Sequence, residues 1–123
     1  KLKNDLEKRA QVRSWYINEL KDNPDIIIPF ANYTGFVSNY IFPIVLKKAN
    51  KEQRDKVREK LQNAGIQTSI HYPPVHLFSC FSGNNKKLHN TELAYQSLIS
   101  LPMYSKLGFD QIKWIADNLY RVV

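Results

Sequence analysis

Three histidines and the only cysteine of the chain lie within nineteen residues, at His71, His76, Cys80 and His89. Imidazole and thiolate groups are common zinc ligands, but this spacing matches no established zinc motif and lacks a Cys-x2-Cys pair. A Cys80 nucleophile activated by a neighbouring histidine is a second hypothesis, although no nucleophile turn or orienting carboxylate accompanies it. The sequence therefore predicts no metal site and no catalytic residue, and it favours a buried or half-buried Cys80.

A second group of polar side chains surrounds a rigid turn. His71 lies at the end of an alternating segment, Pro73 and Pro74 follow two residues later, and His76 comes next after one further residue. Consecutive prolines restrict the backbone, so the side chains beside them lose little entropy when a ligand binds. This arrangement favours His71 and His76 as part of a ligand rim. The alternative is that each histidine only satisfies the end of a strand.

Other motifs that carry chemistry are missing from the sequence. None of the four glycines, at positions 35, 65, 83 and 108, belongs to a glycine-rich phosphate loop. No two carboxylates have a spacing typical of acid–base catalysis, and no RNA-binding signature or recognition helix is present. We therefore expect the chain alone to lack a complete active site and to bind no nucleic acid.

The positive charge is concentrated in one stretch. The formal net charge is +7, and residues 47–60 contain seven basic side chains against three acidic ones. Such an excess can attract nucleic acid, anionic lipid or a phosphorylated small molecule. The alternative interpretation is a solvated helix face on which the signs alternate.

The size and composition are those of one globular domain, with 123 residues, 43% of them hydrophobic and 24% charged. The longest apolar run covers residues 41–46, whereas a membrane span needs about 20 residues, so no membrane segment is predicted. A single cysteine fits a reducing compartment, which predicts a cytoplasmic location. Because the chain starts inside a helical pattern and not with methionine, we interpret it as a piece of a longer protein.

Helix signals occur at four places. Pro24 ends the first helix, because proline cannot donate the helical hydrogen bond. Asn50 and Gln53 form a capping box at the start of the second helix, Gly65 ends it, and Asn90 caps the third. The predicted helices cover residues 1–22, 50–64, 91–99 and 110–122.

Extended segments alternate with these helices. Strand-like patterns are predicted at residues 26–28, 40–46, 66–72 and 101–103, with loops over residues 32–39 and from 73 to 90. Pro43 lies inside the second of these strands and favours an edge position or a bulge. There are too few strands for a doubly wound domain, so we predict an α+β fold in which helices pack on one side of a small sheet.

Three stretches, in order and over nearly the whole chain, resemble one known family. They are Lys8-Arg9-x6-Tyr16, the segment from Arg54 to His76 with its run Gly65-Ile66-Gln67-Thr68-Ser69-Ile70-His71-Tyr72-Pro73-Pro74-Val75-His76, and Ser100-Leu101-Pro102-Met103-Tyr104. The chain is similar to the C-terminal domain of the DegT/DnrJ/EryC1/StrS family, which are pyridoxal-phosphate-dependent aminotransferases of nucleotide-linked keto sugars. The run that ends in His-Tyr-x-Pro-x-His is its most specific part.

The resemblance implies the small C-terminal domain of the aspartate-aminotransferase (type I pyridoxal phosphate) fold over residues 1–123, with a small, mostly antiparallel sheet flanked by helices. A larger domain, absent from this chain, would carry the Schiff-base lysine and the groups that hold the cofactor. The chain alone would therefore bind no pyridoxal phosphate and be inactive. The intact protein would bind pyridoxal phosphate and a nucleotide-diphosphate sugar, and it would form a homodimer.

The resemblance also implies roles for individual residues. The family's His-Tyr-x-Pro-x-His loop lies toward the cleft between the two domains, which makes His71, Tyr72 and His76 candidate substrate-binding residues. The sugar diphosphate would give the basic surface a purpose. Residues 78–90, which include Gly83-Asn84-Asn85, depart from the family pattern and are predicted to influence which sugar is accepted. The alternative function is a stand-alone binding or interaction module with the same fold and no catalysis.

Overall fold

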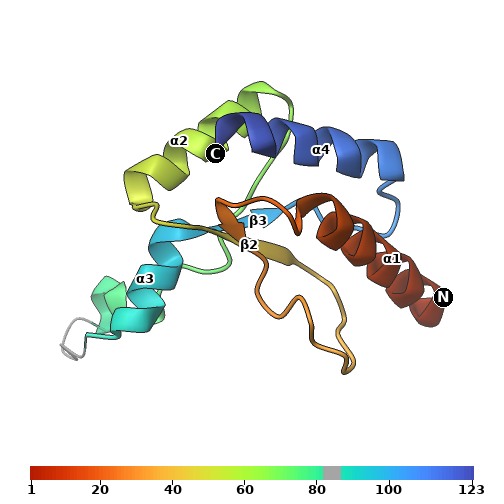
Figure 1. Ribbon diagram of the computed structural model, residues 1–123. Coiled ribbons are helices and arrows are strands. Elements are labelled where there is room, and N and C mark those ends of the chain that lie inside the picture. The colour runs from red at the N-terminus through yellow and green to blue at the C-terminus, as the bar shows by residue number, and fades with distance from the viewer. Residues whose placement is uncertain (82–86) are drawn as a thin grey trace.

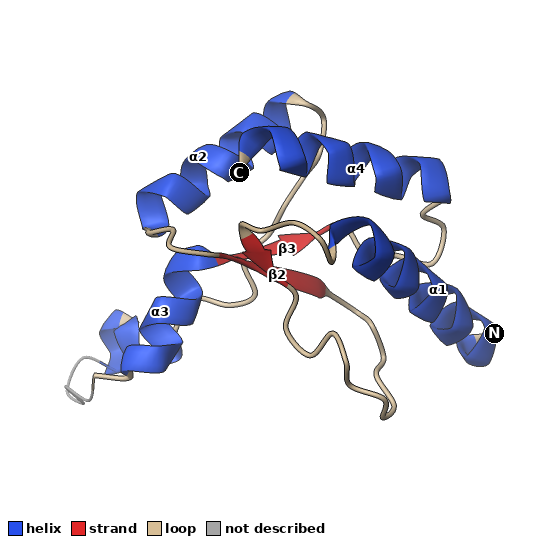
Figure 2. Cartoon of the chain, in the orientation of Figure 1, coloured by secondary structure: helices blue, strands red, loops and turns tan. Residues whose placement is uncertain are grey.

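The computed structural model describes residues 1–81 and 87–123. Figures 1 and 2 show a small central sheet with helices α1, α2 and α4 on one side and the long loop between β1 and β2 on the other. The predicted α+β fold is confirmed. In chain order the elements are α1 (Leu2–Leu20), β1 (Ile26–Ile27), β2 (Phe42–Leu46), α2 (Lys51–Asn63), the 3-10 turns η1 (Val75–Leu77) and η2 (Ser79–Phe81), α3 (His89–Ser97), β3 (Leu98–Leu101) and α4 (Phe109–Val122).

The sheet is antiparallel with the order β1-β2-β3, so β2 is the central strand. Strand β2 as a whole is therefore not an edge strand, although Pro43 itself lies beyond the part of β2 that pairs with β1. Pro43 is tolerated because it lies opposite Ser100, whose backbone N–H and C=O bond to Ser69 and so point away from β2. On the other side β1 pairs only with Val45 and Leu46, so no strand needs a donor from the proline.

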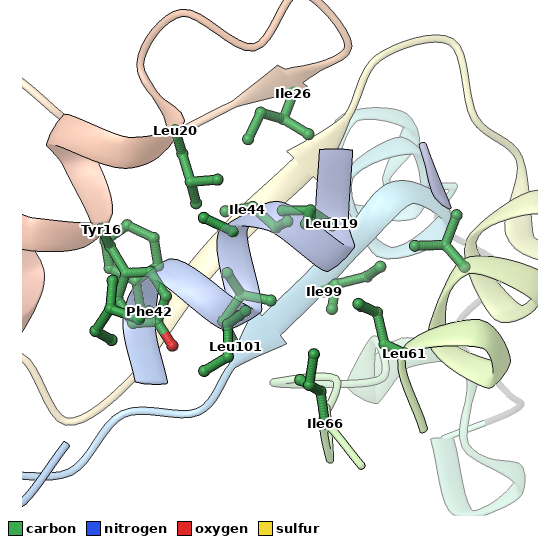
Figure 3. Packing of buried hydrophobic residues seen from close by; sticks show 14 of the residues in the cluster. Tyr16, Leu20, Ile26, Phe42, Ile44, Leu61, Ile66, Ile99, Leu101 and Leu119 are labelled. Atoms are coloured by element: carbon green, nitrogen blue, oxygen red, sulfur yellow. The ribbon is translucent and has the colours of Figure 1, made fainter. Parts of the chain in front are cut away.

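The core fills the space between the sheet and the three covering helices. Tyr16 of α1 stacks on Phe42 of β2, with ring centroids 4.6 Å apart. Ile44 and Ile99 on the two neighbouring strands and Leu119 of α4 are fully buried beside this pair, as Figure 3 shows. Apolar burial of this extent is the main stabilising contribution in a domain of this size.

The start and end of α2 agree with the predicted signals. The Asn50 side chain accepts a hydrogen bond from the Gln53 N–H, and the Gln53 side chain accepts one from the Asn50 N–H, both at 2.9 Å. At the other end Gly65 has a φ of 78°, the left-handed conformation that ends many helices. The capping box and the glycine stop are confirmed.

The predicted strand over residues 66–72 is not formed as a strand. Its burial alternates as predicted through residue 69, with Ile66 and Thr68 buried, but only Ser69 pairs with β3. The backbone of this segment bonds to α2 instead: the Ile66 N–H donates to the Leu61 carbonyl, and Arg58 donates to the Thr68 carbonyl. The segment therefore runs beside the sheet with a single bridge to it.

The third helix differs from its prediction at both ends. Its N-cap is Leu88, so the predicted cap at Asn90 is wrong. The helix ends at Ser97, because Leu98 and Ile99 pair with Val45 and Ile44 of β2. Pairing with a buried central strand overrides the weak helical preference of these two residues. The predicted extended piece at residues 101–103 thus overlaps the last residue of β3, which begins three residues earlier, at Leu98.

Many large apolar side chains are exposed in the loop between β1 and β2 and around the η1 and η2 turns. Phe36 in the first loop is 80% exposed, and Phe78 and Phe81 in the second region are also open to solvent.

Among the described residues, no helix has the length and apolar character that a membrane span requires.

Candidate functional site

A pocket of about 270 Å³ lies where β2 begins and β3 ends. Its lining residues come from three segments that are distant in sequence: residues 40–41, 67–72 and 100–103. The single bridge between Ser69 and Ser100 joins two of these segments. Two of the three predicted substrate-binding residues, His71 and Tyr72, line this pocket.

The His71 and Tyr72 rings contact each other edge-on, with centroids 4.9 Å apart and planes at 84°. The peptide bond between these two residues is cis. The Tyr72 side chain is largely exposed, whereas Nδ1 of His71 is buried and finds no hydrogen-bond partner among the described residues. Both rings are therefore at the pocket, and one buried imidazole nitrogen there is unsatisfied.

Helix α1 fixes part of the pocket lining through its Arg9 and Tyr16 side chains. The hydroxyl of the fully buried Tyr16 donates to the Pro102 carbonyl at 2.8 Å, and burial raises the pKa of Tyr16. Arg9 Nη1 lies 3.5 Å from the carbonyl oxygens of Asn39 and Met103. Two of the three α1 residues named in the family-like motif, Arg9 and Tyr16, thus hold residues 102–103, which line the pocket.

A carboxylate keeps Arg9 in place. Asp5 Oδ2 lies 2.8 Å from Arg9 Nε, one turn away on α1. A hydrogen bond from the Ser105 side chain and then the bond from Arg9 lower the pKa of Asp5. Asp5 is therefore ionised at neutral pH and orients the guanidinium toward the segment after β3.

Ser100 was not predicted as a site residue, although it belongs to one of the family-like stretches. It lines the pocket, is only 3% exposed, and its Oγ finds no partner among the described residues. Its position on the pocket side depends on the register of β3. The sequence pattern does not predict this register, because residues 98–99, the first half of β3, are predicted as the end of a helix.

His76 lies apart from His71 and does not line the pocket. In η1, its Nε2 is 2.9 Å from Glu92 Oε1 of α3, and Glu92 also accepts a hydrogen bond from the Leu88 N–H. The bond to His76, followed by the bond from Leu88, lowers the pKa of Glu92. His76 therefore ties the loop after Pro74 to α3. Its predicted role in substrate binding stays a prediction.

The pocket and the basic stretch lie at opposite ends of β2. The pocket includes residues 40–41, before the strand, whereas residues 47–60 follow it. Of the described residues that line the pocket, none is lysine, arginine, aspartate or glutamate. The pocket is polar but uncharged.

Part of the basic stretch is structural. Arg54 is 1% exposed; its Nε lies 2.7 Å from Asp55 Oδ1, and its Nη1 donates to the Tyr95 carbonyl at 2.8 Å. Arg58 donates to the backbone and side chain of Thr68. These two arginines join α2 to α3 and to the segment that leads to the pocket.

Cys80 in η2 is exposed, so the expectation of a buried or half-buried thiol is wrong. The loop around it turns its aromatic neighbours to solvent and forms no local core. Within residues 1–81 and 87–123 no three His, Cys, Asp or Glu side chains come together as a metal site would require. Gly83, Asn84 and Asn85, predicted to influence the accepted sugar, lie outside the described residues.

A larger groove of about 840 Å³ lies beside α4 and shares Gln67, Ser69 and Pro102 with the pocket. None of the predicted substrate-binding residues lines it. We assign the candidate site to the smaller pocket, because His71 and Tyr72 line it. Its lining residues also include the two, His71 and Ser100, that have a buried polar atom without a partner among the described residues.

Comparisons with known proteins show the family of the chain. The model of the DegT/DnrJ/EryC1/StrS aminotransferase family matches residues 1–120. The chain is 29% identical, over its whole length, to the UDP-4-amino-4,6-dideoxy-N-acetyl-beta-L-altrosamine transaminase of Campylobacter jejuni, covering 33% of that protein. It is 28% identical, again over its whole length, to the dTDP-4-dehydro-2,3,6-trideoxy-D-glucose 4-aminotransferase of Saccharopolyspora spinosa, covering 31% of it.

A solved structure has the same fold. The aminotransferase PseC of Helicobacter pylori, involved in the biosynthesis of pseudoaminic acid, superposes with a TM-score of 0.89 at 24% identity, over 96% of this chain and 32% of that one. The chain thus spans about a third of the length of the relatives it matches.

Proposed function

Because the chain belongs to the DegT/DnrJ/EryC1/StrS aminotransferase family, we propose that it is the C-terminal small domain of an enzyme that aminates nucleotide-linked keto sugars. In that reaction the keto oxygen of the sugar and the amino group of a donor change places. The observation that carries the proposal is the meeting of His71 and Tyr72 at a pocket whose wall is held by Tyr16. All three residues belong to the family-like stretches.

The proposed substrate roles are divided between the two ends of the Pro73-Pro74 turn. His71 and Tyr72 contact the substrate at the pocket. His76 fixes the loop to α3 through Glu92 and extends the substrate rim on that side. Pro74 is buried and starts η1 with a φ of −60°, so the direction of the loop is set before any ligand binds.

The exposed apolar side chains support a partner surface next to the pocket. Tyr72 is 66% exposed at the pocket itself, and Val75 and Leu77 of η1 are exposed close by in sequence. Clusters of exposed apolar residues commonly mark interfaces. We assign this surface to contacts with the larger domain and with the second subunit of a homodimer. We also propose a cytoplasmic location for the intact protein, which agrees with the single cysteine in this part of it.

Pyridoxal phosphate, which serves as an electron sink when bound to an aminotransferase, does not fit the residues that line the candidate pocket. The pocket offers neither a lysine for a covalent linkage nor a cation for the phosphate, and no described acidic residue lines it for the pyridine nitrogen. The cofactor of the intact protein is therefore assigned to the larger domain, and this chain supplies substrate contacts only.

The test is amino-group transfer by the intact protein that contains residues 1–123. Wild-type enzyme loaded with pyridoxal phosphate should use a nucleotide-linked amino or keto sugar of the kind that the relatives' names specify. His71→Ala should lower kcat/KM by roughly 10- to 100-fold, because one positioned polar contact is worth about 1 to 3 kcal/mol. Cofactor content and unfolding temperature should stay unchanged.

A control is Thr91→Ala, since Thr91 is exposed on α3, lies outside residues 78–90 and lines no part of the pocket. It should leave kcat/KM unchanged. Reduced stability with normal kinetics in His71→Ala would instead favour a purely structural histidine.

The alternative function, a stand-alone module, is tested by the gene sequence. A start codon next to Lys1 supports the module, and an upstream coding region about twice as long as this chain supports the aminotransferase.

A further inference from the structure

The Ser100 side chain is buried, polar and unpaired. Ile99 and Leu101, its neighbours on β3, point into the core, so alternation along the strand directs Ser100 to the opposite face of the sheet. Its backbone is bonded to Ser69, but its Oγ has no partner among the described residues. Ser97, at the end of α3, is a contrasting case, because its hydroxyl donates to the Leu93 carbonyl.

Two residues that line one pocket each carry an unsatisfied polar atom. Nδ1 of His71 and Oγ of Ser100 are both buried without a partner among the described residues, and His71 and Ser100 both line the pocket at the end of β2 and β3. A buried polar atom without a hydrogen bond costs about 1 to 3 kcal/mol. A group that enters the pocket and bonds to both atoms would remove this cost, which makes the pocket selective for a ligand with hydrogen-bonding capacity.

The surroundings define the chemistry of that ligand group. A phosphate or carboxylate would need a cation or several N–H donors, and the described lining residues include no lysine or arginine. The Ser100 hydroxyl both donates and accepts, and Nδ1 of His71 does one or the other according to the tautomer, so an uncharged group that can donate and accept matches both atoms. Hydroxyl and amide substituents have that property.

On the basis of the proposed function, we infer that Ser100 is a specificity-determining residue that binds an uncharged hydroxyl or amide substituent on the sugar ring, together with His71. The diphosphate of the substrate binds elsewhere. A site built to bond a polar substituent discriminates strongly against a substrate that lacks it, because its own polar atoms then stay buried and unpaired.

Two nucleotide sugars test this inference. UDP-4-amino-4,6-dideoxy-N-acetyl-β-L-altrosamine carries an amide, whereas dTDP-4-dehydro-2,3,6-trideoxy-D-glucose lacks ring hydroxyls at two positions. In the intact, cofactor-loaded enzyme, Ser100→Ala should lower kcat/KM for the amide-bearing sugar by roughly 10- to 100-fold and for the trideoxy sugar by less than about 2-fold. Each variant is compared with wild type on the same compound, so differences in nucleotide and in reaction direction cancel.

Ser100→Thr keeps the hydroxyl and should recover part of the lost kcat/KM on the amide-bearing sugar. Ser97→Ala, which removes a buried hydroxyl outside the pocket, should change both sugars equally or not at all. Equal losses on both sugars in Ser100→Ala, or a lower unfolding temperature with unchanged kinetics, would overturn the inference and identify Ser100 as a structural residue.

Failure of the proposed function gives a different result. Wild-type enzyme that holds pyridoxal phosphate and transfers amino groups to or from neither sugar would contradict the proposed aminotransferase function. Calorimetric titration of the same two sugars then decides about the pocket. Selective binding of the amide-bearing sugar that is lost in Ser100→Ala supports the inference, and equal or absent binding overturns it.

Discussion

Arg54 is a buried cation, a rare position for a residue type that is normally found at the surface. Its guanidinium is bonded to Asp55 and the Tyr95 carbonyl and lies 5.3 Å from the centre of the Tyr95 ring. Arg54→Ala removes these contacts, leaves the carbonyl unpaired and creates a cavity. We predict a loss of about 3 kcal/mol in the free energy of unfolding, measured by urea denaturation.

Lys51→Ala, on the exposed surface of the same helix, is the control and should change the free energy of unfolding by less than about 0.5 kcal/mol. A loss in Arg54→Ala no larger than in the control would contradict the structural role of Arg54.

Glu92 gives the molecule a pH-dependent contact. Its hydrogen bond with His76 holds the pKa of Glu92 below its ordinary value of 4.5. A carboxylate with a lowered pKa in the folded state stabilises the fold above its unfolded pKa, and this contribution is lost as the pH falls through the lowered value. Wild type should therefore be more stable than Glu92→Gln above about pH 4.5, and the difference should vanish at lower pH in thermal unfolding.

The control variant for this comparison is Glu59→Gln, because Glu59 is exposed on α2. Both variants are compared with wild type over the same pH range, so that the general effect of removing one carboxylate is accounted for. A Glu92→Gln difference that persists unchanged to low pH would show that the bond to His76 contributes nothing.

Single residues could be predicted where local chain chemistry decides their position. The restricted backbone at Pro73-Pro74 favours His71 and His76 as a ligand rim, and the family resemblance adds Tyr72; of these three residues, His71 and Tyr72 line the pocket. Ser100 and Glu92 were missed because their roles depend on tertiary pairing: the first on the register of β3, the second on η1 lying beside α3. No local spacing contains that information.

Helix α2 depends on a side-chain cap at its start. Asn50→Ala removes the bond to the Gln53 N–H and leaves one helical donor without its partner. We predict a loss of about 1 kcal/mol in the free energy of unfolding, measured by urea denaturation. Asn50→Ser, which retains a capping oxygen, should lose much less, and equal losses in both variants would show that the cap itself is unimportant.

Elements with end signals were predictable, and elements that depend on pairing were not. The capping box and Gly65 fixed both ends of α2 from the sequence. Residues 66–72 are predicted as a strand but form only one bridge to the sheet, whereas residues 98–101, of which 98–99 are predicted as helix, form β3. Hydrogen-bond partners and not periodicity decide which extended segment joins a sheet. Arg58 binds the backbone of the first, whereas β2 pairs with the second. The sheet order and the central position of β2 follow from the same pairing.

The whole chain is predicted to be inactive by itself. The 123-residue chain mixed with pyridoxal phosphate should retain no cofactor absorbance after dialysis, because its pocket has neither a lysine nor a phosphate-binding cation among the described residues. The intact protein under the same treatment is the positive control. A stoichiometric adduct on a single lysine of the short chain would contradict the assignment of the cofactor to the larger domain.

The exposed apolar side chains around residues 30–40 and 72–81 have a consequence for experiments on the chain alone. Dyes such as anilinonaphthalene sulfonate fluoresce when they bind exposed apolar surface, and this signal is commonly used to diagnose a molten globule. Here the fully packed native state should bind the dye, since its core and its exposed aromatic groups occupy different parts of the molecule. Near-ultraviolet circular dichroism, which reports fixed packing of rings such as Tyr16 against Phe42, would distinguish the folded chain from a loosened one.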